Sequence, residues 1–284
     1  MDDLELPQFL CSEKTQSSKG DVCGTGIATS KLFLIDYPEP WPSDISETQL
    51  WDITKAIRSE PYFRRSRYLL TKQQGPTQRI QVFTRSGHET LYAQALLGPD
   101  NDYVSTLKSL PELSHDPYDG PTILLICGHD ARDKCCGIKG SELAKQVAAA
   151  DIATEVVSHT AGHRFAPTLI EMPAGNSWAF IDLELAKRIA NHQIQADDYR
   201  VNYRGWWGAK AGAEQIAVRE FKLHNNDDIA QVIKDETITI ETISGSKFSY
   251  SFTESGQETI PQCQIEDGGT LKFRKLYSVE ALPN

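Results

Sequence analysis

The sequence predicts an α/β protein, and three features indicate this class. Apolar runs of strand length alternate with stretches whose apolar residues recur at helical spacing. A strand–helix–strand unit is expected at residues 123–157, where two such runs flank a helical pattern. After residue 228 apolar and polar residues alternate, as in T-I-T-I-E-T-I, which predicts antiparallel strands with one covered face.

The first 112 residues predict the order strand, helix, three strands, helix. Residues 31–36 form the buried run K-L-F-L-I-D, and the prolines of Y-P-E-P-W-P end it. The other elements are expected at residues 50–57, 67–71, 80–84, 89–96 and 102–110. Residues 1–26 are polar and contain several glycines, so an irregular segment is expected there.

Residues 113–224 predict a similar order. Strands are expected at 123–126, 152–157, 168–172 and 178–181, and helices at 137–150, 183–192 and 209–223. The thioredoxin architecture is close to this order, so we predict two tandem thioredoxin-like halves, residues 1–112 and 113–224, and a small antiparallel β appendix, residues 225–284. The Pro- and Gly-rich residues 110–121 are the expected linker. No repeated sequence is visible, so a single composite domain remains an alternative.

The composition favours a cytoplasmic globular protein. At 284 residues the chain is long enough for two domains. No apolar run reaches the roughly 18 residues that cross a bilayer, and the acidic start M-D-D-L-E-L-P lacks the features of a signal peptide. Six irregularly spaced cysteines in such a chain favour metal binding or redox chemistry over a disulfide framework. We therefore expect no membrane partner.

The net charge limits the class of partner. A formal charge of −10 argues against nucleic acid, which selects basic surfaces. It is compatible with docking onto a basic redox partner protein. Acidity also serves solubility alone, so the charge does not identify a partner.

Four potential metal ligands follow two of the predicted strands. Eight residues separate Cys127 from Cys136, and three separate His159 from His163. Neighbouring parallel strands end at one edge of a sheet, so Cys127 and His159 should emerge side by side. Two thiolates and two imidazoles suit tetrahedral zinc or an iron–sulfur cluster with mixed ligands. The eight-residue spacer exceeds that of structural zinc knuckles and favours a larger group, such as a [2Fe–2S] cluster.

Four motifs carry a resemblance to a known family: C-G-H-D-A-R-D-K-C-C-G at 127–137, H-T-A-G-H-R-F-A-P at 159–167, M-P-A-G-N-S-W at 172–178 and Y-R-G at 203–205. With these motifs, residues 11–224 resemble the sucrase/ferredoxin-like proteins. The resemblance implies a thioredoxin fold and a [2Fe–2S] cluster held by Cys127, Cys136, His159 and His163. Cys135 stands where a basic residue is expected, so which of the two adjacent cysteines binds the cluster stays open.

The remaining cysteines are expected to have structural roles. Cys11 and Cys23 could bind a second metal, but no histidine accompanies them. Cys263 lies in an alternating pattern that predicts a strand with a buried face. His129, two residues after Cys127, is either an alternative ligand or a neighbour of the site.

The expected function is one-electron transfer by an iron–sulfur protein, coupled to proton uptake through the ligand imidazoles. A structural zinc module with the same four ligands is one alternative. A thioredoxin-type thiol oxidoreductase is another, although the C-x-x-C that such enzymes carry after their first strand is missing at Cys127. No carboxylate pair in a glycosidase-like setting supports a sucrase activity. Whether the protein also converts a substrate stays open.

Overall fold

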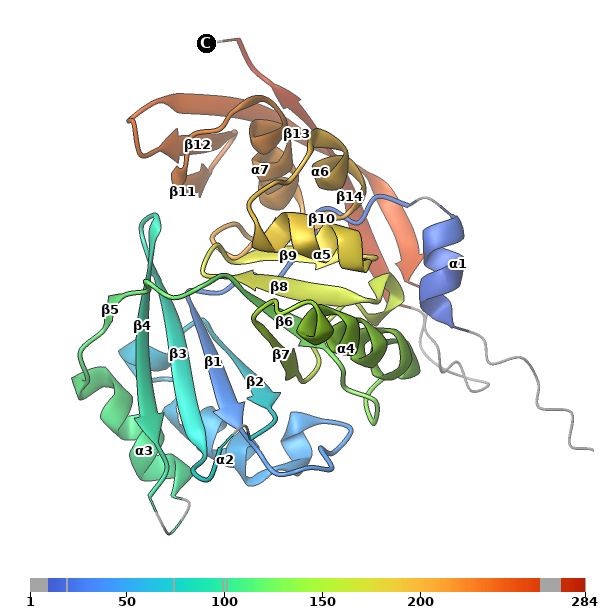
Figure 1. The fold of residues 1–284 in the computed structure, drawn as a ribbon. Coiled ribbons are helices and arrows are strands. Elements are labelled where there is room, and N and C mark those ends of the chain that lie inside the picture. The colour runs from blue at the N-terminus through green and yellow to red at the C-terminus, as the bar shows by residue number, and fades with distance from the viewer. Residues whose placement is uncertain are drawn as a thin grey trace, which may run out of the picture.

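The structure is a computed structural model of the chain, and it describes residues 10–18, 20–73, 75–98, 100, 102–260 and 272–283. The described chain forms a ten-stranded mixed sheet with helices and a separate four-stranded antiparallel sheet at its C-terminal end (Figure 1). The predicted α/β class with a C-terminal antiparallel β appendix is therefore confirmed.

The first unit of the large sheet has the predicted order of elements. It comprises β1 (Lys31–Asp36), α2 (Gln49–Ile57), β2 (Ser66–Thr71), β3 (Arg79–Ser86), β4 (Glu89–Leu96) and α3 (Tyr103–Ser109). Strand β1 runs parallel to β2 and antiparallel to β3, and β3 pairs with antiparallel β4. In the sheet these four strands therefore lie in the order β2, β1, β3, β4.

The second unit repeats this topology. It comprises β6 (Ile123–Cys127), α4 (Ser141–Ala149), β7 (Thr154–Val157), β8 (Thr168–Met172), β9 (Asn176–Ala179) and α5 (Leu183–Ala190). Strand β6 is parallel to β7 and antiparallel to β8, which pairs with antiparallel β9. Both units have the strand order and directions of a thioredoxin-like unit, as predicted, although they share no visible sequence repeat.

The two units meet edge to edge through β2 and β7. These strands are antiparallel and pair at Thr71 and Val157. Just beyond β7, the backbone N–H of Ser158 donates to the carbonyl oxygen of Leu70 at 2.8 Å, and the N–H of Leu70 donates to Ser158 Oγ at 2.9 Å. These contacts make one continuous sheet from two similar units.

Strand β1 is buried on both faces, so its alternate residues belong to different apolar cores. Phe33 and Ile35 pack in the core beneath α2 and α3, whereas Leu32 and Leu34 face the core shared with the second unit. At the end of β1 the carboxylate of Asp36 is fully buried. It accepts hydrogen bonds from Thr71 Oγ1 at 2.8 Å and from the backbone N and Nε of Arg79, both at 3.0 Å.

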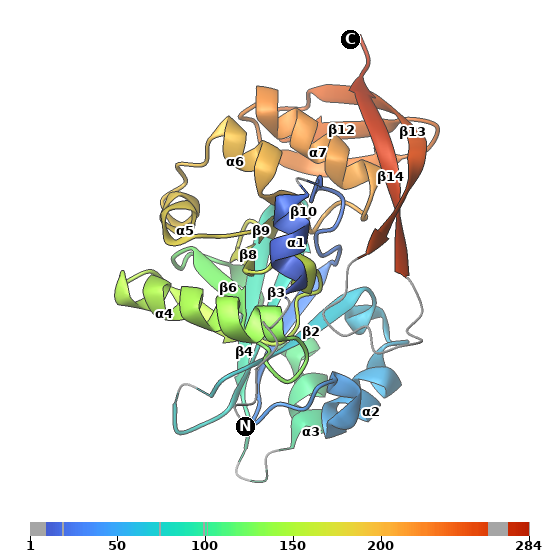
Figure 2. The ribbon, with the colours of Figure 1, turned by 90° about the vertical axis from the view of Figure 1, so that its right-hand side faces the viewer.

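The C-terminal sheet contains β11 (Ile229–Lys234), β12 (Ile238–Thr242), β13 (Lys247–Ile260) and β14 (Lys272–Ala281), antiparallel and in that order. Helix α7 (Ala213–His224) lies between this sheet and the edge of the large sheet (Figures 1 and 2). Phe221 of α7 and Ile240 of β12 belong to the apolar core of the second unit. With 12 residues α7 is the longest described helix, and none in the described ranges is long and apolar enough to cross a membrane.

Short elements are the main difference from the sequence expectation. They are α1 (Cys11–Ser17), β5 (Asp116–Pro117), α6 (Ala196–Val201) and β10 (Tyr203–Trp206). The irregular segment expected at residues 1–26 is thus wrong for α1, which packs against the turn His163–Phe165. Helix α7 begins at Ala213 rather than 209. Elements of two to seven residues are too short for periodicity to reveal them.

We predict that Ser158→Ala lowers the free energy of unfolding by about 1–3 kcal/mol, because the buried N–H of Leu70 loses its acceptor. Urea denaturation followed by far-UV circular dichroism measures the change. The exposed strand residue Ser86 supplies the control, and Ser86→Ala should change stability by less than about 0.5 kcal/mol. Equal effects of the two substitutions would contradict a role for Ser158 at the junction.

Candidate metal centre

The parallel pairing of β6 and β7 brings the two halves of the ligand pattern together. Cys127 is the last residue of β6 and pairs in register with Val157, the last residue of β7. His159 follows Val157 by two residues. The expectation that Cys127 and His159 emerge at one edge of the sheet is confirmed.

The loop between Cys127 and Cys136 is tightly packed, and it places Cys136 at the same edge of the sheet as Cys127. Cys136 begins a π-helical turn, Cys136–Gly140, that leads into α4; such turns are frequent at functional sites. A Cβ atom on Gly140 would lie 1.8 Å from the carbonyl oxygen of Cys127, and one on Gly137 would lie 2.2 Å from Asp130 Oδ1. Only glycine permits both approaches, so Gly137 at the end of the motif and Gly140 just after it shape the loop.

The ligating atoms of Cys127, Cys136 and His159 all lie within 4.8 Å of one another. Both cysteines are fully buried. Nδ1 of His159 is also buried and makes no hydrogen bond with any described residue. A buried polar atom without a partner costs free energy unless it binds something. The donor set and this nitrogen therefore fit a bound metal.

His163 lies next to this group but outside it. The centroids of the His159 and His163 rings are 6.0 Å apart. His163 Nδ1 is 3.5 Å from the carboxylate of Asp133, on the loop before Cys136. Ala161 and Gly162 have φ angles of 64° and 78°, which reverse the chain between the two histidines. The structure thus groups three of the four predicted residues and places the fourth beside them.

Cys135 is buried beside Cys127 and Cys136 but does not belong to the group of candidate ligands. Its Sγ lies 3.6 Å from Sγ of Cys11 in α1, and both side chains are buried. Its backbone N–H donates to Asp133 Oδ1 at 2.8 Å. The geometry therefore places Cys136, rather than Cys135, with Cys127. Cys23 is buried elsewhere, with its thiol 3.4 Å from the carbonyl oxygen of Gln215, and Cys263 lies outside the described residues.

The two buried thiols differ in acidity. A hydrogen bond from Cys136 lowers the pKa of Cys127 well below its usual value, against the effect of burial, and His159 adds to this. The same hydrogen bond, together with burial, raises the pKa of Cys136. Cys127 therefore loses its proton more readily than Cys136. Deprotonation of Cys136 as well needs added positive charge, such as a metal ion provides.

A buried arginine supports the histidine turn. Arg204 of β10 is 1% exposed and donates from Nη2 to the carbonyl oxygen of Thr25 at 2.6 Å. A Cβ atom on Gly162 would lie 2.4 Å from the same Nη2, so the turn rests directly on the guanidinium. Burial lowers the pKa of Arg204 to about 9, and the sulfurs of Cys127 and Cys136 oppose that shift. Arg204 thus stays charged at neutral pH near the thiols. The sequence marked this arginine only through the Y-R-G motif.

His129 positions His159 and is not grouped with the candidate ligands. Its Nδ1 accepts from the backbone N–H of His159 at 3.3 Å, and its Nε2 lies 2.8 Å from the carbonyl oxygen of Pro42. A single tautomer, protonated at Nε2, satisfies both contacts. The side chain thereby ties the strand end to the loop that follows β1.

Fold and site together define a thioredoxin-like α/β protein with a buried Cys/His group that fits a metal. A family model described as sucrase/ferredoxin-like matches residues 22–205, which include all four predicted ligands. The chain belongs to the sucrase/ferredoxin-like family. The match does not reach α7 or the C-terminal sheet. No curated protein and no solved structure matches the chain significantly.

We predict that Gly140→Ala destabilises the protein by about 2 kcal/mol or more, because the new methyl group would meet backbone atoms of Cys127. The urea midpoint and the metal content of the purified protein should fall together. Gly98→Ala is the control, since its Cβ would meet nothing within 4 Å. The proposed packing is wrong if both variants retain normal stability and metal content.

Proposed function

We propose that the protein is an electron-transfer protein whose [2Fe–2S] cluster is held by Cys127, Cys136, His159 and His163. The grouping of three of these donors within 4.8 Å, with the His163 ring next to them, is the observation that carries the proposal. Membership of a family named ferredoxin-like agrees with it. A bound cluster of this type supplies reversible one-electron chemistry.

The chain's own residues favour this chemistry in two ways. Burial of Cys127 and Cys136 keeps water from the sulfurs, and the buried charge of Arg204 offsets their negative charge. Two thiolates bring less negative charge than four, and imidazole ligands accordingly raise reduction potentials relative to all-cysteine sites. The partner we propose is a redox protein that docks at the edge where β6 and β7 end.

A zinc site is the second candidate, because the same four donors suit tetrahedral zinc. Colour separates the two, since a [2Fe–2S] protein absorbs visible light and a zinc protein does not. Thiol exchange is disfavoured. Reactive cysteines are partly exposed, whereas Cys127 and Cys136 are fully buried.

Substitution of single cysteines tests the ligand assignment. We expect Cys127→Ser and Cys136→Ser each to lose most of the iron, sulfide and visible absorbance of anaerobically purified protein. Cys135→Ser should keep all three, because Cys135 faces Cys11 instead. Loss of colour in Cys135→Ser with retention in Cys136→Ser would move the assignment by one residue. Colourless wild-type protein containing zinc would replace the iron–sulfur proposal with the zinc site.

Replacement of both histidines by cysteine tests the other ligand pair. Thiolate also binds ferric iron, so His159→Cys with His163→Cys should keep a [2Fe–2S] cluster. Its reduction potential should fall, because two negative charges have been added. Potentiometric titration monitored by visible absorbance measures the change. A double variant with a cluster of unchanged potential would show that these histidines are not ligands.

A further inference from the structure

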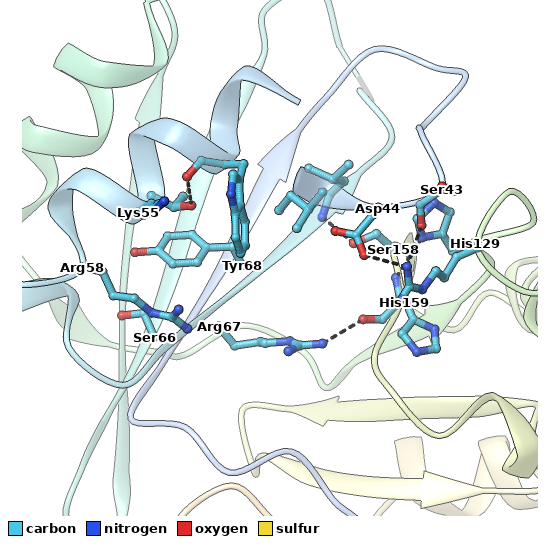
Figure 3. A pocket seen from close by; sticks show the side chains of 15 residues that line it. Ser43, Asp44, Lys55, Arg58, Ser66, Arg67, Tyr68, His129, Ser158 and His159 are labelled. Atoms are coloured by element: carbon cyan, nitrogen blue, oxygen red, sulfur yellow. Dashed lines mark hydrogen bonds and ion pairs between the residues drawn. The ribbon is translucent and has the colours of Figure 1, made fainter. Parts of the chain in front are cut away.

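A cavity beside His159 lies where the two units meet. It has a volume of about 460 Å³, within the size range of small-molecule sites. Its wall on the first unit comes from α2 and β2, and its wall on the second unit comes from the loops after β6 and β7 (Figure 3). We call it the Arg67 pocket, and it is lined by Ser43, Asp44, Ile45, Trp51, Thr54, Lys55, Arg58, Ser66, Arg67, Tyr68, Leu70, His129, Arg132, Ser158 and His159.

The charge of the Arg67 pocket is positive and largely uncompensated. Four cations and one carboxylate line it. The carboxylate of Asp44 is already paired with Arg132 at 2.6 Å. Within the described part of the chain, no carboxylate forms an ion pair with Lys55, Arg58 or Arg67. Burial and the neighbouring charge of Arg58 lower the pKa of Arg67, which shows that the arginines repel each other. An anion would relieve this repulsion.

Buried hydrogen-bonding groups line the same cavity, and they are only partly satisfied. Arg67 Nη2 donates to the carbonyl oxygen of His159 at 3.1 Å, but its buried Nε has no partner among the described residues. The hydroxyls of Ser66 and Tyr68 are also buried; they interact with each other, and neither has another hydrogen-bond partner within the described ranges. Ser66 is only 8% exposed. Burial raises the pKa of Tyr68 to about 12, so its hydroxyl keeps its proton and can donate.

The apolar part of the wall indicates what kind of anion fits. The aromatic residues Trp51 and Tyr68 and the aliphatic residues Ile45 and Leu70 are among those that line the cavity. Arg58, Ser66 and Arg67 lie together on one side, and the Arg67 side chain extends from there toward His159 (Figure 3). Guanidinium groups bind carboxylate and phosphate by paired, charge-assisted hydrogen bonds.

We propose that the Arg67 pocket binds a small organic anion, with its carboxylate or phosphate group on Arg67 and Arg58 and its apolar body against Trp51 and Tyr68. The occupant lies next to the backbone of His159. The first unit, which has no metal-binding motif of its own, thereby supplies a ligand site beside the candidate metal centre. The inference does not depend on which metal that centre holds.

Calorimetric titration of the full chain tests the proposal with four probes. Phenyl phosphate and benzoate carry both an oxyanion and an aromatic body, inorganic phosphate carries only the charge, and benzyl alcohol carries only the body. At least one aromatic anion should bind about tenfold or more tightly than inorganic phosphate, and benzyl alcohol should not bind detectably. Binding of only one aromatic anion identifies the head group as carboxylate or phosphate.

Variants locate the binding site. Loss of a charge-assisted hydrogen bond should weaken binding about 10- to 100-fold in Arg67→Gln. Arg67 also contacts His159, so a second variant, Lys55→Gln with Arg58→Gln, removes two exposed charges without touching that contact. It should weaken binding at least about threefold, as the loss of two exposed charges costs a few tenths to about 1 kcal/mol each. Lys108→Gln, an exposed lysine on α3, should leave binding unchanged.

The proposal is overturned if neither aromatic anion binds at millimolar concentration. It is equally overturned if both pocket variants bind as the wild type does, or if Lys108→Gln weakens binding as much as they do. Should Arg67→Gln fail to fold, the variant with both Lys55 and Arg58 replaced decides the question. Iron and zinc are quantified in every sample, so a change in metal content is separated from a change in anion binding.

Discussion

The edge pairing of β2 with β7 is the interaction on which the rest of the arrangement depends. Each unit alone would expose an unpaired strand at this edge, and exposed edges are templates for aggregation. The pairing removes both edges at once. It also carries the chain after β7 along β2, so that the carbonyl group of His159 reaches Arg67. One set of backbone contacts thus joins the units and positions residues of both the candidate metal centre and the Arg67 pocket.

Charge balance is the second constraint. Two buried sulfurs that lose their protons need nearby positive charge, because ions are costly to bury unpaired. Arg204 lies beneath the turn that holds the histidines, with its donors satisfied by Thr25 rather than by a carboxylate. Its charge is therefore left to act on the sulfurs. Arg132, by contrast, forms an ion pair with Asp44 at the surface.

The sequence predicted several strands correctly from local patterns of apolar and turn residues. Strands β1, β4 and β8 begin and end at the predicted residues, and a proline follows each of them within three residues. It also placed Cys127 and His159 together, because parallel strands share an edge. It did not separate Cys135 from Cys136, since adjacent residues differ only in the direction of their side chains. That direction comes from a π-helical turn and a glycine contact, which leave no periodic signal.

The sequence did not predict the Arg67 pocket. Its lining residues come from segments more than 100 positions apart, such as Asp44 and His159. Nothing in either segment indicates the other. Only the antiparallel pairing of the two units, which depends on long-range contacts, brings their basic and aromatic side chains to one cavity.

The two units use the same topological position differently. At the end of β1 the buried carboxylate of Asp36 is fully satisfied by Thr71 and Arg79. At the end of β6, Cys127 instead lies with Cys136 and His159 in the group that fits a metal. A metal ion bound there would stabilise the folded state by RT ln(1 + [L]/Kd), and its ligands would come from the second unit. The interactions of Asp36 need no such ion, so removal of the metal would lower the free energy of unfolding through the site at residues 127–163 of the second unit.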